Sequence, residues 1–161
     1  MTPDLDDLDD LPPTLPSFPG ATEIWTGAGY LDLADPDPAA LRREDIARAL
    51  SHLARFNGLT ARPYSVADHS LSCARIARRL GHDTEVQRAA LWHDAAEAYL
   101  GDVVSPLKSM VAGYASRERE LSSLIFARFA VAFPFPEDAV RRADALALSA
   151  EKALLFPDAG L

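Results

Sequence analysis

Residues 84–99 read TEVQRAALWHDAAEAY, and this pattern predicts a helix that carries polar residues on its apolar face. The apolar stripe begins at Val86 and recurs at spacings of three and four residues, the period of one side of an α-helix. The same stripe continues through His93 and Glu97, while Asp94 lies about 100° around the helix from His93. These imidazole and carboxylate groups therefore face the interior, where each of them needs a partner.

Two further predicted helices carry a polar residue on an apolar stripe. In the helix expected over residues 65–80, His69 lies on the stripe that begins at Val66. In the helix expected over residues 136–155, Asp144 takes a position where an aliphatic residue would be usual. Three helices thus bring imidazoles and carboxylates toward one interior.

A shared cation would satisfy these groups together. An ionised carboxylate in an apolar interior is costly unless it is paired. His69, His93, Asp94 and Asp144 offer nitrogen and oxygen donors without a thiolate, a set that favours Mn, Co, Fe, Ni or Zn. Cys73 lies one turn after His69 and is expected to be a small buried core residue.

Simpler interpretations of the same residues stay open. His69 alone could be a hydrogen-bonded structural histidine, and Asp144 could pair with Arg141 one turn earlier. A second His-Asp pair, His82-Asp83, follows a glycine in a predicted turn between helices and is expected to be solvated.

The chain as a whole predicts one compact all-α domain. Helices are expected over residues 44–56, 65–80, 84–99, 116–131 and 136–155, which makes about five core helices with short connections. Residues 21–33, ATEIWTGAGYLDL, lack a helical period and predict an extended segment or a short hairpin. Residues 1–22 combine five aspartates with five prolines and predict a mobile tail, so that residues 23–161 form the domain.

Composition and charge exclude several classes of protein. The formal net charge is −8, but residues 1–40 hold nine acidic residues and no base, and the rest of the chain carries 15 acids against 16 bases. The chain lacks the basic excess of a nucleic-acid polymer binder and any apolar run of membrane-spanning length. The acidic start does not resemble a signal peptide, and a single cysteine fits a reducing compartment. A cytoplasmic protein is expected.

Three motifs in this order resemble a known family. They are DHS at 68–70, HDAAEAYLGDVVSPLK at 93–108 and RRADAL at 141–146. Together they resemble the HD-domain phosphohydrolases, and most closely the small bacterial and phage branch with 5′-deoxynucleotidases and short deoxynucleoside triphosphohydrolases. The resemblance covers roughly residues 23–155 and implies a compact HD-domain helical bundle.

The resemblance implies a metal site. His69, His93, Asp94 and Asp144 would be the ligands of one divalent transition metal ion, Mn, Co or Zn in preference to Mg. HD proteins with two metals usually carry further histidines between the HD pair and the last aspartate, and residues 95–143 contain none. A site with one metal is therefore expected.

The resemblance also implies catalytic and substrate-binding residues. Glu97 would be the general acid/base that activates the attacking water, and Asp102 would lie near the sugar 3′-hydroxyl and the leaving group. Arg55 and Phe56 match the arginine–aromatic pair that holds phosphate and packs on the nucleoside, although the deoxynucleotidases often carry tryptophan in the second position.

Three further residues are candidates for substrate contacts. Lys108 and Arg62 could each hold a phosphate oxygen, or could be exposed surface cations. Trp25, beside a Gly-Ala-Gly turn, could stack on a base or cover the helical core.

The expected function is metal-dependent hydrolysis of a small deoxynucleotide, by attack of water on the 5′ phosphate and release of the nucleoside. The close alternative is a deoxynucleoside triphosphohydrolase, acting for example on dATP, that releases triphosphate. A non-catalytic nucleotide-binding HD module and a helical interaction module without metal also stay open. A homo-oligomer would be usual for this family.

Overall fold

The computed structural model describes residues 20–27, 29–131 and 137–156. The predicted tail lies almost wholly outside this range, as does the predicted helix start at Pro136. The chain divides into two compact units, one ending at Pro36 and the other beginning at Asp37.

The first unit contains a β-hairpin, as the sequence predicts for residues 21–33. Strands β1 (Glu23–Thr26) and β2 (Gly29–Asp32) pair antiparallel, with Trp25 opposite Tyr30. The two rings meet edge to face with their centroids 4.7 Å apart, a favourable geometry for an aromatic pair. The hairpin is thus held by its backbone ladder and by this cross-strand contact.

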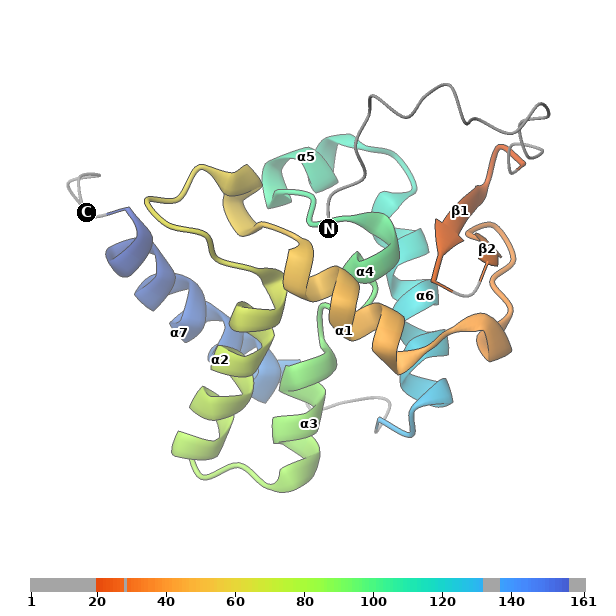
Figure 1. The fold of residues 1–161 in the computed structure, drawn as a ribbon. Coiled ribbons are helices and arrows are strands. Elements are labelled where there is room, and N and C mark those ends of the chain that lie inside the picture. The colour runs from red at the N-terminus through yellow and green to blue at the C-terminus, as the bar shows by residue number, and fades with distance from the viewer. Residues whose placement is uncertain (1–19, 28, 132–136, 157–161) are drawn as a thin grey trace. The chain divides into compact units, whose positions relative to one another are not determined.

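The second unit is helical, which confirms the all-α prediction (Figure 1). A short 3₁₀ helix, η2 (Pro38–Ala40), precedes the α-helices, and a second, η3 (Arg55–Gly58), lies between α1 and α2. The α-helices are α1 (Arg43–His52), α2 (Val66–Arg79), α3 (Thr84–Trp92), α4 (Glu97–Leu100), α5 (Ser105–Met110), α6 (Tyr114–Arg128) and α7 (Glu137–Leu155). Each helix in the described segments is too short or too polar to cross a lipid bilayer.

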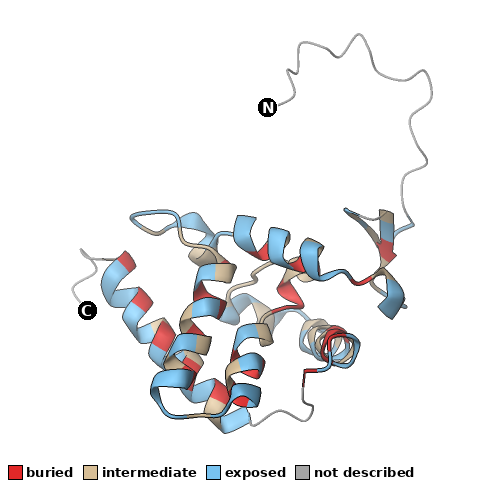
Figure 2. Cartoon of the chain, turned by 60° about the horizontal axis from the view of Figure 1, so that its bottom comes forward, coloured by how far each residue is buried: buried red, intermediate tan, exposed pale blue. Residues whose placement is uncertain are grey.

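The packing of α2 positions the polar residues predicted to share an interior. Helix α2 packs against α3, α7 and α1, and α3 also packs against α7. Buried residues lie on the inner sides of α1, α2, α3 and α7 (Figure 2). On α2, Val66, Cys73 and Ala77 are fully buried, and His69 is buried among them with no exposed surface. The helical period therefore predicted the inward face of α2 correctly.

The first predicted helix ends earlier than expected. It stops at His52, because Ala54 forms a β-bridge with Ser65, with Arg55 N–H donating to the carbonyl of Tyr64. Phe56 then adopts a left-handed backbone, with φ 55° and ψ 33°. This conformation is costly for a bulky side chain, and such strain is most often found at functional sites.

The predicted helix over residues 84–99 is interrupted at the His-Asp pair. Helix α3 ends at Trp92, and α4 begins at Glu97. Between them the chain tightens to 3₁₀-type hydrogen bonds, such as that from Glu97 N–H to the carbonyl of Asp94. Asp83, predicted to be solvated, is the N-cap of α3 and accepts from Val86 N–H.

We expect the N-cap of α2 to contribute measurably to stability. The Ser65 hydroxyl oxygen accepts from Asp68 N–H at 3.1 Å, and the Asp68 carboxylate accepts from Ser65 N–H at 3.1 Å, which completes a capping box. Ser65→Ala should lower the free energy of unfolding by about 1 kcal/mol and the Tm by about 2–4 °C. Calorimetry measures both. Ser123→Ala, which removes only an exposed bond within α6, is the control; equal Tm values for the two variants would contradict the assignment.

Candidate metal centre

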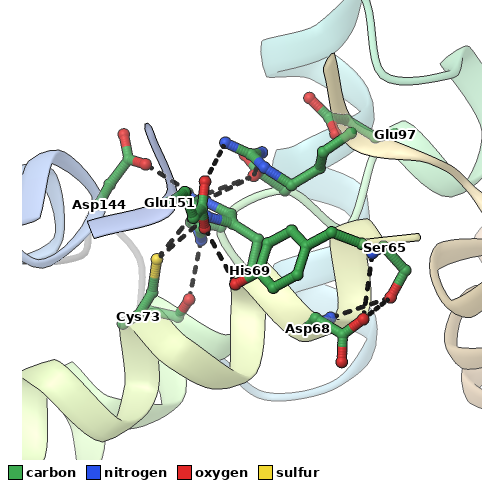
Figure 3. Close-up of polar contacts among 12 residues, drawn as sticks. Ser65, Asp68, His69, Cys73, Glu97, Asp144 and Glu151 are labelled. Carbon is green, nitrogen blue, oxygen red and sulfur yellow. Dashed lines mark hydrogen bonds and ion pairs between the residues drawn. The ribbon is translucent and has the colours of Figure 1, made fainter. Parts of the chain in front are cut away.

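Four predicted ligands from three elements converge around the imidazole of His69. Its Nε2 atom lies 3.1 Å from Oδ1 of Asp144 on α7 and 3.5 Å from Oδ2 of Asp94, in the turn after α3. Nε2 of His93 lies 3.2 Å from the same Asp94 oxygen. Asp144 does not pair with Arg141, which contacts Glu137 and Asp138 instead. Residues more than 70 positions apart thus form one cluster, in which His69 is buried and the other three residues are half-buried (Figure 3).

The turn after α3 leaves one nitrogen of His93 available as a ligand. Nδ1 of His93 donates to the carbonyl of Ala90 at 2.8 Å, a bond that fixes the ring and its tautomer. Nε2 is buried and has no hydrogen-bond partner of acceptable geometry among the described residues. A buried nitrogen lone pair facing two carboxylates is well suited to a cation, so the residues present fit a metal ion.

Glu151 supports His69 from the other side, and sequence reasoning missed it. Nδ1 of His69 donates to Oε1 of Glu151 at 2.6 Å, and Glu151 is only 4% exposed. A carboxylate behind a histidine in this way orients the ring and directs Nε2 toward a metal. The spacing in the sequence could have indicated this role for Glu151. Glu151 lies seven residues, or two helical turns, after Asp144, and the two side chains are therefore on the same face of α7.

Cys73 is buried as predicted, but its sulfur also lies within the cluster. Ligand atoms of His69, Cys73, His93 and Asp144 lie within 4.8 Å of one another, a group that could hold a metal ion. Sγ of Cys73 is 3.4 Å from Nε2 of His69. Burial raises the pKa of the thiol, which favours the neutral form over a thiolate ligand.

A cavity of about 500 Å³ opens beside the cluster. Most of the residues predicted to act on the substrate line it, together with some that were not predicted: Arg55, Phe56, Asp94, Glu97, Asp102, Val103, Val104, Ser105, Pro106, Lys108, Asp144, Leu148 and Lys152. Gly101, with φ 79°, allows the sharp turn that places Asp102 in the lining. The cavity thus joins the candidate ligands to the candidate catalytic residues.

Two predicted phosphate contacts are engaged with acidic residues. The guanidinium of Arg55 lies 3.2 Å from Glu151 and 3.8 Å from Asp94. Nζ of Lys108 donates to Glu97 at 3.0 Å and to Glu118 at 2.6 Å. Both cations line the cavity, where they are held in place by carboxylates.

Arg62 and Trp25 are the two remaining predicted substrate contacts, and the stacking role of Trp25 stays a prediction. Arg62 lines a different cavity, beside α2 and α7. Trp25 belongs to the hairpin unit, where it is 72% exposed and contacts Tyr30. Lys152, which was not predicted, lines the main cavity two turns after Asp144.

Comparison with known proteins identifies the fold that carries this centre. A sequence model of the HD domain matches residues 50–141. The chain belongs to the HD-domain family. The matched segment contains His69, His93 and Asp94 and ends before Asp144, which is placed in the cluster by its distance to His69.

Two bacterial relatives cover most of the chain. An uncharacterized protein of Rhodobacter capsulatus is 37% identical over 139 residues, which span 80% of this chain and 71% of the relative. The uncharacterized protein YfdR of Escherichia coli is 32% identical over 131 residues, 81% of this chain and 69% of the relative. HD domains bind divalent metals, and this general property agrees with the cluster described above.

The electrostatics of the cluster around His69 favour a bound cation. Burial alone would lower the pKa of His69, but its hydrogen bonds to Asp144, Cys73 and Glu151 raise that pKa to about 12. The pKa of Asp144 is lowered, first by its bond to His69. Carboxylates around these imidazoles therefore stabilise positive charge, supplied by a proton or by a metal ion that displaces it.

We expect Glu151→Gln to weaken metal binding. The amide cannot accept from His69 with the strength of a carboxylate, so Mn affinity should fall by about 10- to 100-fold. Titration calorimetry with the purified protein measures the affinity, and Glu120→Gln, which removes an exposed carboxylate of α6, is the matched control. Equal affinities in the two variants would show that Glu151 does not support the centre.

Proposed function

We propose that this protein is a metal-dependent hydrolase of deoxynucleotides, in which water attacks the 5′ phosphate and the nucleoside is released. Membership of the HD-domain family fits a phosphohydrolase in general. The observation that carries the proposal is the position of Glu97, which is 3% exposed and lines the cavity together with Asp94 and Arg55. The residues that we propose as acid/base group, metal ligand and phosphate-binding cation thus line one cavity.

The cation that we propose is one Mn, Co or Zn ion held by His69, His93, Asp94 and Asp144. When bound, it would polarise a phosphoryl oxygen and make the attacking water more acidic. Four protein ligands leave one or two positions of a five- or six-coordinate ion for water and substrate.

Glu97 has the environment of a general acid/base. Burial and the nearby charge of Asp94 raise its pKa to about 8, although Lys108 opposes the shift. Such a pKa lies close to neutral pH, where a group can both accept and return a proton. Glu97 would take the proton of the attacking water as the new P–O bond forms, and would return it to the leaving O5′ of the nucleoside as the P–O5′ bond breaks. Asp102 lines the same cavity, and the role we propose for it is contact with the sugar.

Arg55 is suited to hold the phosphate. Its side chain is 12% exposed, and its ion pairs with Asp94 and Glu151 fix the guanidinium beside the candidate ligands. A planar guanidinium binds two phosphate oxygens better than an ammonium does. Phe56 lies next to it, with the guanidinium carbon 5.3 Å from the ring centroid, and offers an apolar surface to the nucleoside.

Turnover should depend on the ionisation of Glu97. Glu97→Gln should lower kcat by about 10²- to 10⁴-fold while the bound metal content stays unchanged. For the wild type, kcat/KM for dAMP should fall as the pH falls through the pKa of Glu97, because protonated Glu97 cannot accept a proton.

Phosphate release with Mn-loaded protein measures this activity, and Glu118→Gln, which also contacts Lys108, controls for a change in local charge. Near-wild-type turnover by Glu97→Gln would contradict the acid/base role. Metal binding and dAMP binding without turnover by the wild type would favour the non-catalytic module.

One observation favours the triphosphohydrolase as the second candidate. Arg55 and Lys108 are each paired with two carboxylates, whereas Lys152 makes no ion pair with another described residue. A monophosphate needs only the metal and Arg55, but a triphosphate brings further negative charge. Lys152 lies about 12 Å along α7 from Asp144, a distance that a triphosphate and a lysine side chain can span together.

Lys152 should therefore separate the two candidates. If a deoxynucleoside triphosphate is the substrate, Lys152→Ala should lower kcat/KM for dATP at least about tenfold and leave that for dAMP nearly unchanged. Chromatography of the products distinguishes phosphate from triphosphate. Arg142→Ala, on the same helix but outside this cavity, is the control. An equal effect on both substrates would remove this argument for the triphosphate.

A further inference from the structure

A second cavity, of about 310 Å³, lies beside α2 and α7. Three arginines line it: Arg75 and Arg79 from α2, and Arg62 from the loop that precedes α2. We call this cavity the arginine pocket. Its residues are distinct from those that line the cavity beside the metal centre (the metal-centre cavity), and the proposed reaction gives the three arginines no role.

The positive charge of the arginine pocket is not neutralised by the protein. In the described part of the chain, none of the three arginines forms an ion pair with a carboxylate. Glu151 is the one acidic residue in the lining, and its carboxylate is already bonded to His69 and Arg55. Arg75 and Arg79 are also one helical turn apart, a spacing at which like charges destabilise a helix.

Apart from Glu151 and the hydroxyls of Tyr64 and Ser72, the remaining lining is apolar. Ile76 of α2 and Ala147, Ala150 and Leu154 of α7 supply aliphatic surface, and Leu154 is 67% exposed. Guanidinium groups recognise phosphate through paired hydrogen bonds, and an aliphatic surface accepts the apolar part of a ligand. We propose that the arginine pocket binds a phosphorylated small molecule at a site separate from the metal centre.

The pocket is connected to the metal centre by a short chain of hydrogen bonds. Tyr64 lines the pocket, and its hydroxyl donates to Oε1 of Glu151 at 3.2 Å. The same carboxylate oxygen accepts from Nδ1 of His69 at 2.6 Å. An anion in the pocket also offsets three positive charges that disfavour a cation nearby. Occupancy of the arginine pocket therefore raises the affinity of the centre for its metal.

Binding of AMP to metal-loaded protein tests the site. We use a Glu97→Gln background, which suppresses turnover, and titration calorimetry. Arg79→Ala should weaken binding at one site at least about tenfold, whereas Arg78→Ala, the adjacent exposed arginine of α2 outside the pocket, should leave it unchanged. Arg55→Ala should not affect this site, which separates it from the metal-centre cavity.

Arg62→Ala repeats the test from a different element, so that a local change in α2 cannot explain the result. Equal AMP binding by the Arg78→Ala and Arg79→Ala variants, with Arg62→Ala also unchanged, would overturn the proposal. So would loss of all AMP binding in Arg55→Ala.

The link to the centre is tested by measuring Mn affinity with and without AMP. AMP should raise it at least about fivefold in Arg78→Ala, and Arg79→Ala should lose most of this increase. The same increase in both variants would show that the arginine pocket does not act on the metal centre.

Discussion

The candidate metal centre depends on one hydrogen bond, from Nδ1 of His69 to Oε1 of Glu151. This bond fixes which nitrogen of the imidazole faces Asp94 and Asp144, and so decides whether the ring can act as a ligand. Both groups are almost fully buried, where an unpaired charge would be costly. The contacts between α2 and α7 are therefore constrained by polar chemistry as well as by apolar packing.

Two stretches of irregular backbone, the turns after α3 and the segment at Phe56, contribute side chains to the same cavity. The 3₁₀-type turns after α3 place Asp94 and Glu97 in the lining of one cavity. On the opposite side, the left-handed backbone of Phe56 places its ring in the lining beside Arg55. Local strain and helix breaks thus coincide with the proposed chemistry.

Charge is distributed differently in the two cavities of the helical unit. In the metal-centre cavity, Arg55 and Lys108 are neutralised by carboxylates that also hold them in position. In the arginine pocket, the three arginines face no carboxylate that is free to pair with them in the described chain. Glu151 lies between the two, because it accepts from His69 and also lines the arginine pocket. Ligands in the two cavities would therefore act on a shared residue.

The sequence by itself determined the all-α class, the inward face of α2 and the polar residues that interrupt apolar stripes, because helical periodicity is a local property of the chain. It did not predict the end of α1 at His52, since the bridge between Ala54 and Ser65 joins residues that no periodic pattern relates. It also missed Glu151, Lys152 and the grouping of Arg62 with Arg75 and Arg79. Glu151 and the three arginines come together only when α2 packs against α7, and Lys152 joins the main cavity only when α7 packs against α3, because tertiary packing decides which side chains of separate helices come close.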